Sequence, residues 1–103
     1  MTDDAYGPAA LMVARGQTVR FVFRNEGRVV HEALIGDASL QAAHDRVMLA
    51  GGHEHVEGLP VVDVAPGSTG ELVYTFDRAG QVLIGCHQPG HYALGMRAVI
   101  TVT

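Results

Sequence analysis

The chain has 103 residues, of which 48% are hydrophobic, and this size and composition predict one globular domain over residues 1–103. The formal net charge is −4 and no run of basic residues occurs, which argues against a protein that binds nucleic acid. No segment approaches the roughly 18–20 apolar residues in a row that a membrane-spanning helix requires.

Most of the chain alternates apolar residues with a period of two, the pattern of β-strands that bury one face. The strand-like segments are residues 18–25, 29–35, 71–76, 81–86 and 97–103. Turn signals such as Asn25-Glu26-Gly27 and Pro66-Gly67-Ser68 separate them. Short strands at regular intervals with turns between them predict an all-β fold, a sandwich or a barrel.

One segment departs from this alternation and has apolar residues at helical spacing instead: Leu40, Ala43, Val47 and Met48. Asp37 or Ser39 can cap its start, and Gly51-Gly52 would end it. We therefore expect one short helix over residues 38–50, inserted between strands and followed by a polar loop.

Cys86 is the only cysteine, so it is a buried thiol, a nucleophile or a metal ligand, but not half of an internal disulfide. His91 follows five positions later and Met96 five positions after that. A thiolate, two imidazoles and a weak axial thioether make up the trigonal copper site of blue copper proteins. His31 is the best candidate for the missing imidazole, because a lone histidine in an apolar strand is costly to bury without a polar partner.

The segment CHQPGHYALGM, residues 86–96, resembles the CHxPGHYxxGM motif of bacterial cupredoxins, small blue copper proteins related to plastocyanin and azurin. Residues 21–36 and 65–80 also have the look of this family, so the resemblance covers nearly the whole chain. It implies a Greek-key β-sandwich with copper, cycling between Cu(II) and Cu(I), at one end. The metal ligands that it implies are His31, Cys86, His91 and, more weakly, Met96.

The implied activity is one-electron transfer by a monomer, not an enzyme, with the electron passing through His91 to a redox partner protein. Such copper proteins are usually periplasmic or extracellular, and the resemblance implies the same here. Taken alone, Met1-Thr2-Asp3-Asp4 lacks an export signal and predicts a cytoplasmic protein. Because relatives usually carry more sequence before the segment matching Met1–Pro8, we expect this chain to start partway into the first strand.

One position departs from the pattern of plastocyanin and azurin. Where those proteins have Asn after the first histidine ligand, this chain has Glu32. We expect its backbone N–H still to support the Cys86 sulfur, while a carboxylate so close would shift the redox potential. Tyr92, beside His91, either shields the metal from water or packs in the core.

Other metal and cysteine chemistries remain as weaker alternatives. A multicopper oxidase requires His-Cys-His, whereas the chain has Gly85-Cys86-His87, and a dinuclear purple site requires two cysteines. A cysteine hydrolase would leave Met96 without a role. A structural zinc site would use Cys86, His87 and His91. We expect His87 to be a non-ligand near the surface.

A second group of histidine and methionine side chains raises the possibility of an accessory metal site. His44 and Met48 are four residues apart on one helix face, and His53 and His55 follow in the polar loop. Imidazole and thioether suit copper, Cu(I) especially. If they bind metal, the protein would be a periplasmic or extracellular copper-handling or copper-resistance protein. Solvated histidines and a core methionine are the simpler interpretation.

Overall fold

The computed structural model describes residues 1–2, 5–7, 9–51, 59–88, 91–92 and 96–103. This part of the chain forms, in order, β1 (Ala10–Val13), β2 (Thr18–Arg24), β3 (His31–Gly36), α1 (Ala38–Leu49), β4 (Val61–Val64), β5 (Thr69–Thr75), β6 (Gly80–Gly85) and β7 (Arg97–Val102). Among these residues no helix is both long and apolar enough to cross a membrane.

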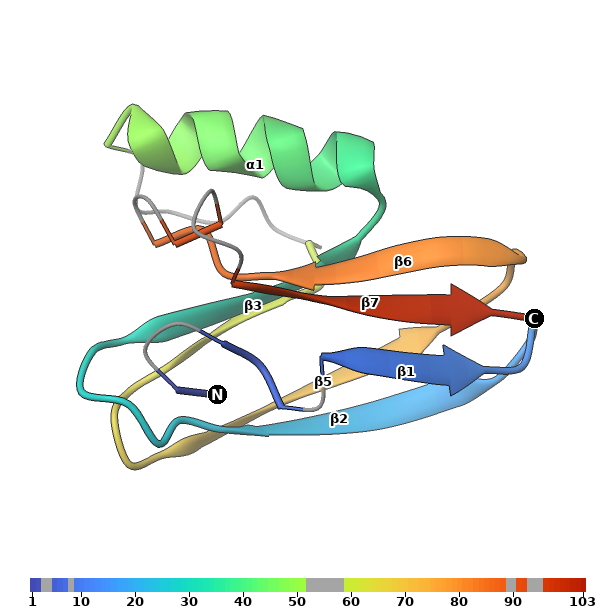
Figure 1. Ribbon diagram of the computed structural model, residues 1–103, viewed down its shortest axis with the longest axis horizontal. Helices are drawn as coiled ribbons and strands as arrows, with labels where there is room; N and C mark the ends of the chain where they lie inside the picture. Colours follow the sequence, from blue (N-terminus) through green and yellow to red (C-terminus); the bar gives the residue numbers. More distant parts are fainter. Residues whose placement is uncertain (3–4, 8, 52–58, 89–90, 93–95) are drawn as a thin grey trace.

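The strands form two sheets packed face to face, with α1 on the outer face of the larger one (Figure 1). The larger sheet has the order β1-β7-β6-β3-β4, and the smaller sheet pairs β2 with β5. β1 runs parallel to β7, and the other pairs are antiparallel. The chain changes sheet four times, on entering and leaving β2 and on entering and leaving β5, as in a Greek-key sandwich. The predicted β-sandwich with one inserted helix is confirmed.

The core lies between the two sheets and follows the predicted alternation. Phe21 and Phe23 of β2 face inward and stack with ring centroids 6.0 Å apart. Phe76, which is 1% exposed, packs edge-on against Phe21 at 6.1 Å. Burying one such ring contributes about 1.5–3 kcal/mol to the stability of the fold.

β3 is buried along its whole length, because α1 covers one of its faces and the smaller sheet covers the other (Figure 1). Ala33 and Ile35 belong to the core between the sheets. Glu32 and Leu34 alternate with them and therefore lie on the side of α1. The face of β3 that solvent would otherwise cover thus carries the buried carboxylate of Glu32.

Helix α1 begins and ends close to the predicted positions. The Asp37 side chain caps it by accepting a hydrogen bond from Leu40 N–H at 2.8 Å. It ends before Gly51, whose φ of +88° is a left-handed conformation that favours glycine. Gly36 lets the first helical turn approach the strand, because a Cβ there would overlap the Leu40 side chain. The helix is therefore held tightly over β3 and β6.

Candidate metal centre

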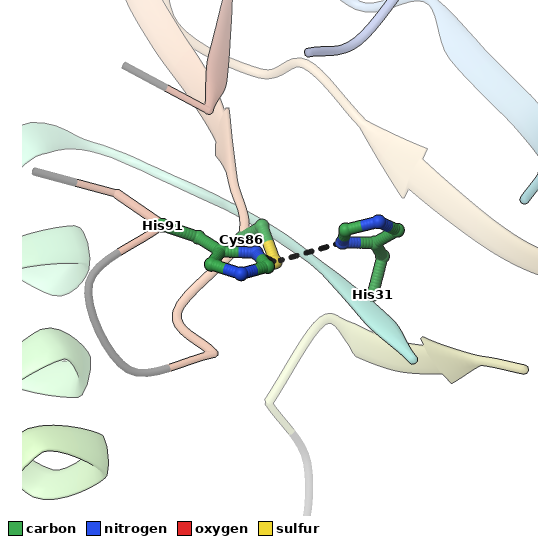
Figure 2. Close-up of side chains that lie close together, drawn as sticks. All are labelled: His31, Cys86 and His91. Carbon is green, nitrogen blue, oxygen red and sulfur yellow. Dashed lines mark hydrogen bonds between the residues drawn. The ribbon is translucent and has the colours of Figure 1, made fainter. Parts of the chain in front are cut away.

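Three side chains with metal-binding atoms meet at one end of the sandwich: His31, Cys86 and His91 (Figure 2). Cys86 Sγ lies 3.8 Å from His31 Nδ1 and 3.6 Å from His91 Nδ1. All three ligand atoms lie within 4.8 Å of one another. His31 and Cys86 are fully buried, and His91 is half-buried. The three predicted strong ligands are thus brought together.

The sheet register explains why residues 55 positions apart meet. β3 and β6 are antiparallel neighbours, with Leu34 opposite Gly85, so the start of β3 lies beside the end of β6. His31 alternates with Glu32 and shares the core face of β3 with Ala33. Cys86 follows β6 in the same alternation as Ile84, which also faces the core. Both side chains therefore project to the same side of the larger sheet.

The donor atoms have the spacing of a shared metal ion. With bonds of about 2.3 Å to sulfur and 2.1 Å to nitrogen, as in zinc sites, the observed Sγ–Nδ1 separations subtend roughly 110–120° at the metal. These angles span the range from tetrahedral to trigonal, and one thiolate with two imidazoles is the donor set of a blue copper site. The residues present therefore fit copper.

The surroundings of the Cys86 thiol act on its pKa in opposite directions. Burial raises its pKa, while hydrogen bonds from the backbone of Glu32 and Gln88 act in the opposite direction. Glu32 N–H donates to Cys86 Sγ at 3.3 Å, as expected from the sequence. A metal ion bound at the sulfur would deprotonate it outright.

Met96 is tied to the other ligands through its backbone. Its N–H donates to His91 C=O at 3.0 Å, and its C=O accepts from Cys86 N–H at 3.1 Å. Its side chain is 1% exposed and belongs to the same core cluster as Cys86. The role of Met96 as an axial ligand stays a prediction.

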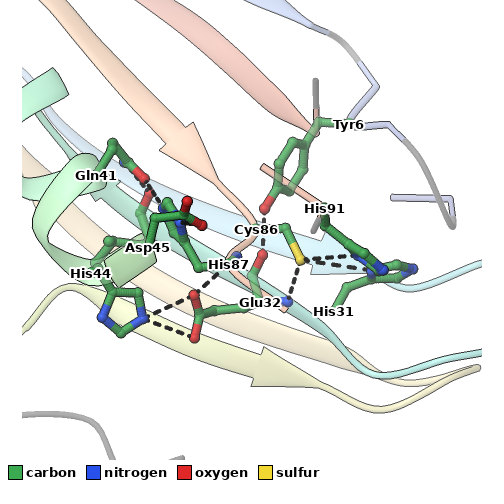
Figure 3. Close-up of polar contacts among 10 residues, drawn as sticks. Tyr6, His31, Glu32, Gln41, His44, Asp45, Cys86, His87 and His91 are labelled. Atoms are coloured by element: carbon green, nitrogen blue, oxygen red, sulfur yellow. Dashed lines mark hydrogen bonds and ion pairs between the residues drawn. The ribbon is translucent and has the colours of Figure 1, made fainter. Parts of the chain in front are cut away.

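The Glu32 carboxylate points toward α1 (Figure 3). Its oxygens lie 3.0–3.1 Å from His44 Nε2, and one accepts His87 N–H at 3.2 Å. The Glu32 C=O accepts a hydrogen bond from the Tyr6 hydroxyl. The sequence drew attention to this carboxylate but not to the partners that hold it.

His87 is not near the surface, and that expectation was wrong: its side chain is completely buried. Alternation places it opposite Cys86, under α1, where Nδ1 lies 3.0 Å from Asp45 Oδ1 and the ring stacks on Tyr92 at 4.4 Å. Burial lowers the pKa of this imidazole, against the effect of Asp45. Because its ring faces away from Cys86, the zinc trio with His91 does not form (Figure 3).

The accessory group can be followed only in part, because His53 and His55 lie outside the described residues. His44 and Met48 do share one helix face, and both are buried. Within the ranges that the structure describes, the one group of three or more histidine, cysteine or acidic side chains close enough for a metal is His31, Cys86 and His91. The accessory site stays a prediction.

Comparison with known proteins gives consistent results. A family model described as copper binding proteins, plastocyanin/azurin family, matches residues 2–103. The copper-resistant cuproprotein CopI of Rubrivivax gelatinosus is 38% identical over 97 residues, and that of Pseudomonas aeruginosa is 33% identical over 129 residues. These matches cover 94% and 97% of this chain but 59% and 71% of those proteins. The chain thus spans little more than half of the Rubrivivax relative.

Solved structures share the fold. Reduced auracyanin from Roseiflexus castenholzii superposes with a TM-score of 0.82 at 23% identity, covering 99% of this chain and 93% of that one. Auracyanin A from Chloroflexus aurantiacus, described as a blue copper protein, gives a TM-score of 0.74 at 29% identity, covering 98% and 90%. These superpositions confirm the cupredoxin-like sandwich.

Proposed function

The chain belongs to the plastocyanin/azurin family of copper binding proteins and has copper as its cofactor, and from this premise we propose that it transfers single electrons. In this proposal His31, Cys86 and His91 hold one copper ion, and Met96 is the weak axial ligand. The observation that carries the proposal is the contact of Cys86 Sγ with both imidazole Nδ1 atoms at 3.6–3.8 Å.

Copper bound there would supply one-electron chemistry by alternating between Cu(II) and Cu(I). The packing of the chain would keep the ligand positions nearly the same in both states. His31 and Cys86 are buried in the sandwich, and Glu32 N–H donates to the sulfur at 3.3 Å. Packed side chains have little room to move, so little rearrangement would accompany the change of charge.

His91 is the half-buried ligand and is the proposed exit for the electron. A redox partner protein docking over it would come closer to the metal than one docking elsewhere, because His31 and Cys86 are covered. The protein would then be a monomeric carrier and not an enzyme, since the donor and the acceptor of the electron are other proteins.

A role in copper resistance is the second candidate, and the names of the Rubrivivax and Pseudomonas relatives favour it. We propose the periplasm or the extracellular space as the location in either case. A copper-handling protein would hold the same central copper and take up further copper at His44, Met48, His53 and His55.

The first test is a Cu(II) titration of the metal-free protein, followed by visible absorption and electron paramagnetic resonance. An intense thiolate-to-copper band should saturate at one equivalent and disappear in Cys86→Ser. A colourless protein that takes up zinc in place of copper would overturn the proposal.

The same titration separates the two candidates. Further copper bound without added colour, and lost in the double substitution His53→Ala/His55→Ala, would favour copper handling. One copper per chain with fast electron exchange would favour the carrier.

A further inference from the structure

We propose that α1 is a clamp on the metal centre, and that Glu32 and His87 are positioning residues through which it acts. The clamp consists of Glu32, His87 and three side chains of α1: Gln41, His44 and Asp45. None of these five belongs to the metal-ligand cluster. The inference rests on the proposed copper site and adds the residues that hold its ligands in place.

The clamp acts on two residues that directly follow metal ligands and face α1. Each of two ligands, His31 and Cys86, faces the core, so the residue that follows it faces the opposite side of the sheet. Those residues are Glu32 and His87, and both side chains are 0% exposed. A contact that fixes the position of Glu32 or His87 therefore also restricts the position of the ligand residue directly before it.

The helix presents a matching polar face. Gln41, His44 and Asp45 are spaced i, i+3 and i+4 and therefore lie on one side of α1. His44 Nε2 contacts the Glu32 carboxylate at 3.0 Å, and Asp45 Oδ1 contacts His87 Nδ1 at 3.0 Å (Figure 3). Helix α1 thus holds Glu32 and His87, which are the sequence neighbours of two ligands from different parts of the sheet.

Gln41 fixes the distance of the helix from the sheet. Its amide nitrogen donates to Leu34 C=O at 2.8 Å and to Leu83 C=O at 3.0 Å, on β3 and β6 respectively. The two donations fix the orientation of the amide, so its oxygen faces His87 Nε2. Both ring nitrogens of His87 therefore have partners on α1.

Glu32 also joins the two ligand segments directly. Its carboxylate accepts His87 N–H at 3.2 Å, and its own N–H donates to Cys86 Sγ at 3.3 Å. The start of β3, which carries His31, is in this way tied to the residues that follow β6. The separation of the ligands is therefore set by hydrogen bonds as well as by the sheet.

Stability alone gives little reason for this arrangement. A buried carboxylate and buried imidazoles lose their hydration, and well-packed apolar side chains of similar volume usually stabilise a fold at least as well. What a buried polar network provides is a defined geometry, because hydrogen bonds have preferred distances and directions. Partners behind metal ligands commonly orient those ligands.

The test compares an apolar replacement of the clamp, Glu32→Leu/His44→Leu, with the conservative Glu32→Gln. The double variant removes the Glu32–His44 pair together and so leaves no unpaired buried charge, while His87 N–H loses its acceptor. In Glu32→Gln the new amide can still accept His87 N–H and still contact His44. Val47→Ala, at a helix position that is 49% exposed, is the matched control.

Two properties of each folded variant are measured: copper affinity by competition with a chelator, and the rate at which Cys86 of the metal-free protein reacts with an alkylating agent. In Glu32→Leu/His44→Leu copper affinity should fall roughly 10- to 100-fold, and the thiol should react faster. Glu32→Gln and Val47→Ala should stay close to the wild type. A folded double variant with unchanged affinity and unchanged thiol reactivity would overturn the clamp.

Asp45→Ala keeps the proposal testable if the double variant does not fold. Asp45 is 20% exposed, so its loss is tolerated more easily, yet it removes one anchor of the His87 ring. The metal-free thiol should again react faster, and no change would count against the clamp. The alkylation rate of Cys86 is measured without copper. A wild-type protein that binds no copper would therefore overturn the proposed function, while the alkylation rates would still test the clamp.

Discussion

Gly85→Ala is the sharpest test of how closely α1 and the ligand segment pack. An added Cβ would overlap the side-chain oxygen of Gln41 and lie 2.8 Å from Tyr92 Cε1. Overpacking costs about 1–3 kcal/mol, and moving the Gln41 oxygen off the buried His87 ring adds roughly 1–3 kcal/mol. The lower entropy of the unfolded alanine chain offsets about 0.4–1 kcal/mol. The expected net loss is about 3 kcal/mol.

The assay is thermal and urea unfolding of the metal-free protein, followed by circular dichroism, because bound copper would itself stabilise the native state. For a chain of this length the expected loss lowers the melting temperature by roughly 10–25 °C. Gly7→Ala is the control, since a Cβ at Gly7 would meet nothing within 4 Å. Two variants that unfold within about 0.5 kcal/mol of each other would refute the packing described around Gly85.

Three other outcomes follow from single residues. Asn25→Ala should lower the free energy of unfolding by about 2–3 kcal/mol, because the buried amide donates to two backbone carbonyls and accepts from one backbone N–H. Urea unfolding with no measurable loss would contradict this. Burial raises the pKa of Tyr6, so the folded state holds its proton more tightly and stability should fall above about pH 10; ultraviolet titration should show Tyr6 ionising only on unfolding. Arg20→Gln should cost less than about 1 kcal/mol by thermal unfolding, because its ion pair with Glu71 is well exposed; a larger loss would show that this pair matters more than exposed pairs usually do.

The strands and the helix were largely predictable because their signals are local. The alternation in residues 18–25 became β2, and the helical spacing in 38–50 became α1. The first strand, β1, was expected at the start of the chain but lies at Ala10–Val13, and β4 was missed, because four residues hold too little alternation to stand out. Their strand character depends on hydrogen bonds to β7 and β3, which are distant in the sequence.

The ligand cluster was predictable and its surroundings were not. The even spacing of Cys86, His91 and Met96 is a local signal, and His31 was the histidine in an apolar strand. The burial of His87 depends on α1 lying over the outer face of the sheet, and no local sequence pattern predicts that position of the helix. A signal did exist, because His87 directly follows a residue that faces the core and must face the opposite way.

The two outer strands of the larger sheet are also its shortest. β1 and β4 have four residues each, and Asp63 places an exposed carboxylate on β4. An open sheet edge presents unpaired N–H and C=O groups to which another chain can add a strand, and short or charged edges prevent this. Two such edges would offer few ladder hydrogen bonds to a second molecule, so this sheet is protected against strand-to-strand aggregation.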